Sequence, residues 1–214
     1  MNNVYENDMR FLPLLKFIDK YKKLIVSIIF LIVGVSSFIL ITNQIQKQKT
    51  EEAALIYSDW LIEFEQDKPD TEKLNQLLDQ FLNNYRKTGY TQLALLSKAN
   101  HDAKLKNYED SLVNFNELIV LTDGFNGNKI FNKIGRVSSS RILFSMEKYD
   151  EALKMIEIYT SSDTNAFIHE LTGDILLKQS KSDLALKQYK KAESKYIDET
   201  SKSIISMKIA SIGT

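Results

Sequence analysis

The residue types that most often carry acid–base or metal chemistry are scarce in this chain. His101 and His169 are the only histidines among 214 residues, and cysteine is absent. Neither histidine is followed four residues later by a second histidine or a carboxylate, so neither forms the paired helix face that holds zinc. The sequence therefore predicts no catalytic residue, no metal site and no cofactor. Each histidine is expected at the surface or half buried.

Acidic pairs and short motifs do not change that prediction. Glu51–Glu52 and Asp198–Glu199 are sequence neighbours, whose side chains point to different sides of a helix and are expected to be solvated. The chain has no glycine-rich phosphate loop, no G-x-S-x-G elbow and no H-E-x-x-H motif. Its 28 basic and 28 acidic residues leave no net charge to attract nucleic acid. We therefore expect neither an enzyme nor a nucleic-acid-binding protein.

The longest apolar run, residues 24–41, predicts a transmembrane helix. It contains no charged residue, and at about 1.5 Å per residue it reaches roughly 27 Å, enough to cross the hydrocarbon core of a bilayer. A soluble helix needs no apolar side chains around its whole circumference. Close contacts between membrane helices depend on small residues, and the candidates for such contacts here are Ser27, Gly34, Ser36 and Ser37.

The distribution of positive charge predicts the orientation of this helix. The cations before the span are Arg10, Lys16, Lys20, Lys22 and Lys23, whereas residues 42–60 contain only Lys47 and Lys49. Lysine and arginine close to a span stay on the cytoplasmic side. Residues 1–23 are therefore predicted to be a cytoplasmic tail, and residues 42–214 a domain on the outer side.

A cleaved signal peptide is the alternative interpretation of the same run. The basic start fits it, and residues 35–37 could serve as a small-residue cleavage site. Against it, the apolar run is longer than that of a typical signal, and four more apolar residues follow the candidate site. We therefore favour an uncleaved anchor.

Residues 42–214 are predicted to form one all-helical domain. Only 7 glycines and 2 prolines occur in the whole chain, which favours long helices. The membrane helix is expected to continue outward until Pro69 and Asp70, where Asp70 starts the next helix as its N-cap. Apolar residues then recur at helical spacing: Leu74, Leu77, Leu78, Phe81, Leu82 and Tyr85.

Three later segments repeat one pattern of small, apolar and aromatic residues. A small residue stands where two helices would cross, and a second small residue and an aromatic or apolar one follow at set distances, as in tetratricopeptide hairpins. The copies are Ala99, Ser111, Phe115 and Leu118; Ser140, Leu143, Ala152, Ile156 and Tyr159; and Gly173, Leu176, Ala185, Tyr189 and Ala192. In the first copy Asp102 stands where an apolar residue belongs, so Ala103 is expected to take that place.

The spacing of the copies locates a loop and a cap. The crossing residues Ala99, Ser140 and Gly173 lie 41 and then 33 residues apart, against a standard repeat of about 34. The excess falls in residues 123–128, which are predicted to be a loop between hairpins. A capping helix is expected to cover the apolar side of the last hairpin with Ile204, Ile205, Ile209 and Ile212.

A stack of this kind has a concave face lined by the first helix of each hairpin. The repeat frame places seven candidate peptide-binding residues on that face: Asn100, Lys104, Arg141, Phe144, Asp174, Leu177 and Lys178. Their mixture of donors, both charges and apolar area suits an extended or partly unfolded peptide. Phe144 could instead pack against a neighbouring hairpin, and the sequence leaves that open.

A short tail, one span, degenerate tetratricopeptide hairpins and an isoleucine-rich helix together resemble the ancillary SecYEG translocon subunit family, the YfgM-like proteins of bacterial inner membranes. Residues 68–70, 84–90 and 207–209 add to the resemblance. It implies a single-pass inner-membrane protein with a cytoplasmic N-terminus and a periplasmic domain. The implied partners are the Sec translocon (SecYEG), periplasmic chaperones and unfolded exported proteins, with the lipid bilayer around the anchor.

A second class of function remains open at this stage. The same architecture serves as a tetratricopeptide scaffold subunit in a cell-envelope assembly or division complex. A chaperone-like module binds many unfolded segments, whereas a scaffold binds one folded partner tightly.

The predicted topology can be tested by thiol labelling, since the chain has no cysteine of its own. A cysteine introduced at Ser162 should react with a membrane-impermeant reagent added outside the inner membrane, and one at Asn3 should not. The opposite pattern would reverse the predicted orientation.

Overall fold

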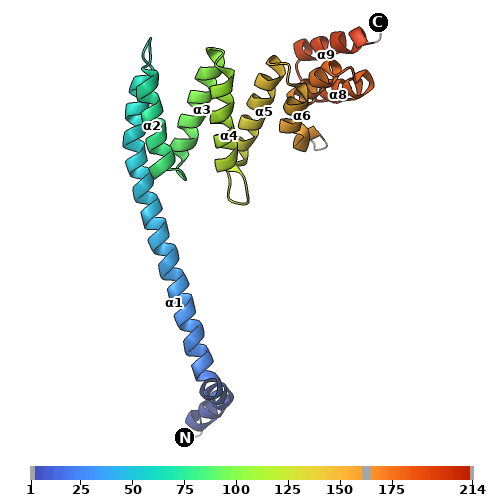
Figure 1. Cartoon of the computed structure of the whole chain (residues 1–214). Coiled ribbons are helices and arrows are strands. Elements are labelled where there is room, and N and C mark those ends of the chain that lie inside the picture. Colours follow the sequence, from blue (N-terminus) through green and yellow to red (C-terminus); the bar gives the residue numbers. More distant parts are fainter. Residues whose placement is uncertain (1–2, 161–164, 213–214) are drawn as a thin grey trace. The chain divides into compact units, whose positions relative to one another are not determined.

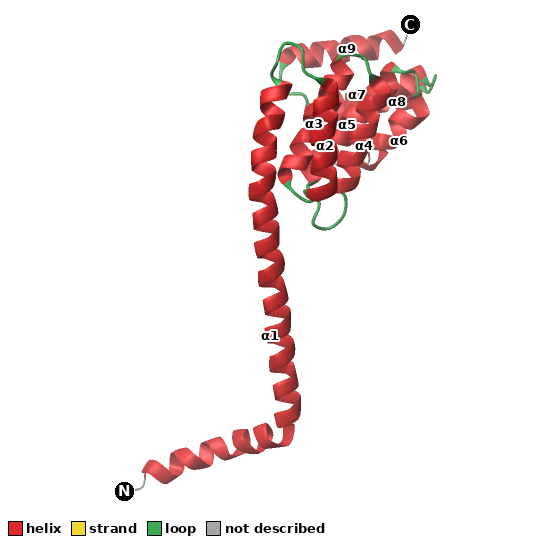
Figure 2. Ribbon diagram, turned by 60° about the vertical axis from the view of Figure 1, so that its left-hand side comes forward, coloured by secondary structure: helices red, strands yellow, loops and turns green. Residues whose placement is uncertain are grey.

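The computed structural model describes residues 3–160 and 165–212, and all regular structure in those two ranges is helical (Figures 1 and 2). The labelling position Ser162 lies outside them. The predicted all-α fold class is confirmed. The helices are α1 (Asn3–Phe64), α2 (Thr71–Asn84), α3 (Gly89–Lys104), α4 (Tyr108–Thr122), α5 (Lys129–Ser145), α6 (Tyr149–Thr160), α7 (Ala166–Lys178), α8 (Ser182–Lys195) and α9 (Glu199–Ile212).

The chain divides into two compact units, residues 1–52 and residues 53–214. The first consists of α1 up to Glu52. Among the described residues, α1 is the one helix that is long and apolar enough to cross a membrane, and none of its apolar window is buried. The candidate contact residues lie on this exposed part: Ser27 donates its hydroxyl to the carbonyl of Lys23 (2.9 Å), and Gly34 has no neighbour within 4 Å. Their role as membrane-helix contacts stays a prediction, as do the boundaries at residues 23 and 41.

The second unit begins with the last part of α1, from Ala53, which pairs with α2. The ring centroids of Trp60 and Phe81 lie 6.3 Å apart in this pair, and both side chains are fully buried. The indole nitrogen of Trp60 also donates to the hydroxyl of Ser97 on α3, at 3.2 Å. Asp70 caps α2 by accepting hydrogen bonds from two backbone amides, as predicted.

Helices α3 to α8 form three antiparallel hairpins, α3–α4, α5–α6 and α7–α8, each packed against the next (Figure 1). The predicted crossing residues meet inside them. The Ser111 hydroxyl donates to the Ala99 carbonyl at 2.6 Å, and the Ser140 hydroxyl donates to the Ala152 carbonyl at 2.8 Å. At Gly173 a Cβ atom would lie 2.5 Å from the Tyr189 ring, so only glycine fits there without a shift of the ring.

The turn inside each hairpin is built in the same way. Lys106, Glu147 and Ser180 have φ angles of 64°, 60° and 59°, in the left-handed region. In the second hairpin the Glu147 amide donates to the carbonyl of Phe144 (3.0 Å), and the next amide donates to the carbonyl of Leu143 (2.9 Å). These two bonds make a Schellman motif, and the other two turns repeat it. The structural repeat therefore has the same spacing as the sequence repeat.

One expectation about the first of these hairpins is wrong. Asp102 itself occupies the apolar position, with 3% of its surface exposed, while Ala103 is only half buried. The Asp102 carboxylate is bound by the ammonium of Lys98 at 2.7 and 2.8 Å and by the Asn114 amide at 3.1 Å. A carboxylate tolerates burial when a cation and further hydrogen bonds compensate for the lost water.

Helix α9 covers the apolar side of the last hairpin. Ile205 is completely buried against the α8 residues, and Ile209 and Ile212 pack around it. Ile204 does not belong to this face, since it is 41% exposed. Adjacent helical residues point about 100° apart, so Ile204 and Ile205 cannot both face α8.

The contact between Gly173 and Tyr189 yields a stability prediction. Gly173→Ala should lower the free energy of unfolding by about 1–3 kcal/mol, because the methyl group meets a buried ring. The matched control is Gly89→Ala on α3, where an added Cβ has no neighbour within 4 Å; its stability should be unchanged or raised by up to about 1 kcal/mol.

Hydrogen exchange should show which helices lose stability in the Gly173→Ala variant. Protection should fall mainly in α7, α8 and α9, because each unit of a repeat protein contacts only its neighbours. Equal loss in α2 would contradict a stack of semi-independent hairpins.

Candidate peptide-binding groove

A groove of about 780 Å³ runs across the first helices of the three hairpins, α3, α5 and α7. Its lining combines apolar, aromatic, amide, hydroxyl and charged groups of both signs. The lining residues are Asn100, Ala103, Lys104, Tyr108, Phe115, Ser138, Arg141, Ile142, Phe144, Ser145, Phe167, Glu170, Leu171 and Asp174. Both the size and the chemistry are suited to a polypeptide segment.

The groove brings together five of the seven predicted concave-face residues: Asn100, Lys104, Arg141, Phe144 and Asp174. Leu177 and Lys178 are not among its lining residues. They lie in the last turn of α7, beyond Asp174, whereas the groove extends toward the first turns of that helix. Whether the five residues bind a peptide stays a prediction.

The α5 side of the groove carries its most distinctive side chains. The guanidinium of Arg141 lies over the Phe167 ring of α7, 5.8 Å from the ring centroid. This cation–π contact holds the guanidinium between the two helices. The Phe144 ring packs on Tyr149, with centroids 5.7 Å apart, while it also lines the groove. The Tyr149 contact lies within the α5–α6 hairpin to which Phe144 itself belongs, and the role of Phe144 in peptide binding stays a prediction.

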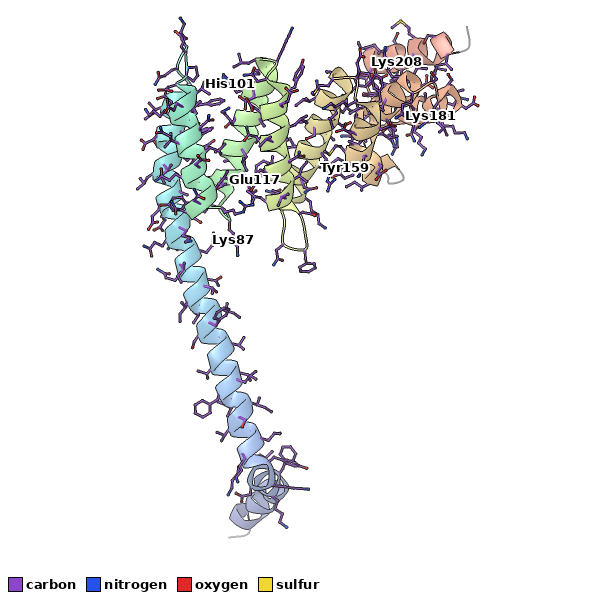
Figure 3. The ribbon with its side chains drawn as sticks, in the orientation of Figure 1. Lys87, His101, Glu117, Tyr159, Lys181 and Lys208 are labelled. Atoms are coloured by element: carbon purple, nitrogen blue, oxygen red, sulfur yellow. The ribbon has the colours of Figure 1, made fainter. Side chains whose placement is uncertain are left out.

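The α7 side of the groove is acidic, and α9 supplies its counter-ion. The ammonium of Lys208 on α9 lies 2.8 Å from Glu170 and 2.7 Å from Asp174 (Lys208 is labelled in Figure 3). Asp174 also accepts a hydrogen bond from the Tyr189 hydroxyl at 2.7 Å, and Glu170 accepts one from Tyr196. These contacts join α7, α8 and α9 at one end of the groove.

The same contacts shift the ionisation of three groups. Burial raises the pKa of the Tyr189 hydroxyl above its ordinary value, and the hydrogen bond to Asp174 raises it further. Burial and the hydrogen bond to Glu170 likewise raise the pKa of Tyr196. Burial alone would lower the pKa of Lys208, but its hydrogen bonds to Asp174 and Glu170 outweigh that effect and hold the pKa above its usual range.

Several groove residues on α5 and α7 were not predicted from the sequence although helical spacing points to them, among them Phe167, Glu170 and Ser138. Phe167 and Glu170 precede Asp174 by seven and four residues, and Ser138 precedes Arg141 by three. These intervals place them on the same helix faces. Lys208 gave no such signal, since it lies 34 residues beyond Asp174 on a different helix.

Neither histidine lines the groove, and the expectation of an exposed or half-buried position is wrong for His169. His169 is 1% exposed, and its Nδ1 atom lies 2.8 Å from the side-chain oxygen of Gln188. It thus packs inside the α7–α8 hairpin. His101 is half buried, as expected, with its ring 5.4 Å from that of Phe64.

Helical hairpins stacked one on the next, each turning through a left-handed residue and together lining one groove, define the class of tetratricopeptide-like repeat proteins. The chain belongs to the family described as tetratricopeptide repeat-like domain, whose model matches residues 16–214. The ancillary SecYEG translocon subunit of Aggregatibacter actinomycetemcomitans is 27% identical over 152 residues, which cover 69% of each chain. The resemblance inferred from the sequence is thereby confirmed. No solved structure matches the chain.

The raised pKa values predict a loss of stability in alkali. The folded state retains protons that the unfolded chain releases, so the stability contributed by Tyr189, Tyr196 and Lys208 is complete below the ordinary tyrosine value of 10.0 and falls as the pH rises above it. The urea midpoint of fragment 43–214 should therefore be flat near neutral pH and fall toward about pH 11.

Two variants check the origin of that fall. Tyr189→Phe should reduce the alkaline fall in the urea midpoint, because phenylalanine has no proton to release. Tyr149→Phe, on α6, should leave that fall unchanged. A midpoint that stays constant through the alkaline range would contradict the assignment.

Proposed function

We propose that the protein is a single-pass component of the bacterial inner membrane whose periplasmic domain associates with the Sec translocon and binds extended segments of exported proteins. By doing so it would assist their chaperoning or their hand-over to periplasmic chaperones. Three observations support the proposal: the membership of the tetratricopeptide repeat-like family, the apolar stretch 24–41 within α1, and the similarity to the ancillary SecYEG translocon subunit of Aggregatibacter. A binding role without catalysis accords with all three.

The single observation that carries the proposal is the composition of the groove. It offers an aromatic face at Phe144, donors at Asn100 and Lys104, and an arginine, Arg141, held against a ring. Aromatic and arginine side chains contribute most of the binding energy at many protein interfaces. A groove that offers several kinds of contact without one deep pocket suits segments of varied sequence.

The attachment of α9 is the observation that favours the alternative function. Lys208 already neutralises Glu170 and Asp174, so the acidic end of the groove is occupied by the chain itself. A scaffold subunit that binds one folded partner would use such a permanently ordered end. The two functions differ in what the remaining groove binds: many unfolded segments, or one folded surface.

Paired substitutions in and beside the groove test the proposal. Arg141→Ala with Phe144→Ala should weaken the binding of unfolded peptides from exported proteins about tenfold or more, because two anchoring side chains are lost. The control is Leu177→Ala with Lys178→Ala, which also removes one apolar and one cationic side chain. The repeat pattern places both residues on the concave face, but they do not line the groove, so the control should have little effect. Fluorescence anisotropy with labelled peptides measures both.

The membrane segment provides the second arm of the test. Replacement of residues 24–41 by an unrelated span of equal length should weaken copurification with the translocon and leave peptide binding intact. If the span replacement left copurification intact while the groove variant abolished it, the groove itself would be the docking surface, and the scaffold function would be the better description.

A further inference from the structure

The edge of the domain at which α2 turns into α3 and α4 passes into α5 has an unusual surface. The helices alternate in direction, so residues 85–88 and the loop 123–128 lie at the same edge, which we call the loop edge. Figure 3 shows Lys87 there, and His101 toward the opposite side of the domain. A hollow of about 760 Å³ opens between the two segments, and its lining includes Arg86, Lys87 and Asn126.

The tip of the 123–128 loop presents a phenylalanine entirely to solvent. Phe125 is 99% exposed, the most exposed of the large hydrophobic side chains that the structure describes. A phenylalanine ring that is left in water forgoes the favourable free energy of transfer into an apolar phase.

The loop holds this ring outward by its own geometry. Gly124 has φ of 88°, and the amide of Gly127 donates to its carbonyl at 3.2 Å. A Cβ at Gly127 would lie 2.1 Å from the Thr122 carbonyl oxygen, so the loop folds back tightly on the end of α4. Asn128 then closes the loop by capping α5. Phe125 is thus displayed by a short, internally bonded turn.

Three basic residues belong to, or directly follow, the segments that form the loop edge. Lys87 and Lys129 are exposed, and Arg86, which pairs with Glu117, keeps 47% of its side chain accessible. Lys129 opens α5, where the helix dipole disfavours a cation, and the first turn of α5 has no acidic residue. Asp123 is the acidic residue lining the hollow. The edge therefore combines an apolar tip with an excess of positive charge.

The path of the chain limits what this edge can meet. Ala53 opens the domain, and in the α1–α2 pair Tyr57 packs against Phe81 and Tyr90, so the domain begins at the loop edge. Ala53 follows Ile41, the end of the apolar run, by only twelve positions, about 18 Å if the connection is helical. This short connection limits how far Ala53 can lie from a membrane that residues 24–41 cross.

We propose that the loop edge docks on the anionic lipid surface of the membrane in which the protein is anchored. Phe125 enters the boundary between headgroups and acyl chains, and Lys87, Lys129 and Arg86 face the lipid phosphates. Aromatic residues with lysine or arginine are the pairing that binds interfaces of this kind. This docking is independent of the translocon and of peptide binding, and it would hold the groove at a set height above the bilayer.

The test uses the full chain in nanodiscs without any other protein. The absence of native cysteine allows an environment-sensitive fluorophore at Asn126→Cys, beside Phe125, or at Asp67→Cys, in the α1–α2 turn on the opposite edge. Nanodiscs contain either phosphatidylcholine alone or one third phosphatidylglycerol, with a nitroxide-labelled lipid as the quencher. We expect strong quenching at position 126 in the anionic discs, and little at position 67 in either.

Variants of exposed residues, each with a matched control, test which side chains hold the loop edge on the lipid surface. Phe125→Ser should reduce the docked population severalfold, and Lys87→Glu with Lys129→Glu should reduce it at least fivefold for each cation, from about 1 kcal/mol per cation near an anionic surface. The control, Lys68→Glu with Lys106→Glu, makes the same charge change at the opposite edge and should have no effect. Because these side chains are exposed, circular dichroism should show an unchanged fold.

Three results would overturn the proposal. Equal quenching at the two positions would mean that the domain has no preferred edge. Quenching at position 126 that is insensitive to Phe125→Ser would mean that the tether alone brings the loop near the lipid. Protection of position 126 that appears only when the translocon is added to the discs would assign the loop edge to a protein partner.

Discussion

The close crossing of two helices within each hairpin is the constraint on which the rest of the domain depends. At Ala99 with Ser111, and at Ser140 with Ala152, a serine hydroxyl bonds the facing carbonyl across the crossing. At Gly173 the Tyr189 ring fills the space that a side chain would need. A larger residue at any of these positions would separate the helices. The first helices would then no longer align, and the groove that they line would lose its shape.

The last hairpin shows how packing and electrostatics are combined. Tyr189 fills the crossing with its ring and bonds Asp174 with its hydroxyl, while Lys208 of α9 bonds the same carboxylate. The cap is therefore attached through the apolar contact of Ile205 and through a charge cluster at the end of the groove. A change in how α9 is held would alter both the stability of the stack and the charge that a bound segment meets.

Features that depend on residues close together in the chain could be predicted from the sequence. Asp70 as N-cap, the crossings at Ser140 and Gly173, and the 123–128 loop each follow from local spacing. The sequence was insufficient where a side chain is satisfied by a distant partner. The burial of His169 depends on Gln188 of the next helix, and the acidic end of the groove depends on Lys208. Asp102 is intermediate, because its partner Lys98 stands only four residues earlier and the pairing is visible in the sequence once burial is assumed.

The order of contacts along the chain suits synthesis that proceeds from the N-terminus. Each hairpin packs on the one before it, and the crossing bond from Ser140 to Ala152 spans only 12 residues. A hairpin that leaves the ribosome can pack at once on the hairpin before it, which has already emerged. No early hairpin depends on a partner far along the chain. The longest wait falls on Glu170 and Asp174, whose counter-ion emerges 38 and 34 residues later. During that interval the two carboxylates lack the counter-ion that Lys208 later supplies.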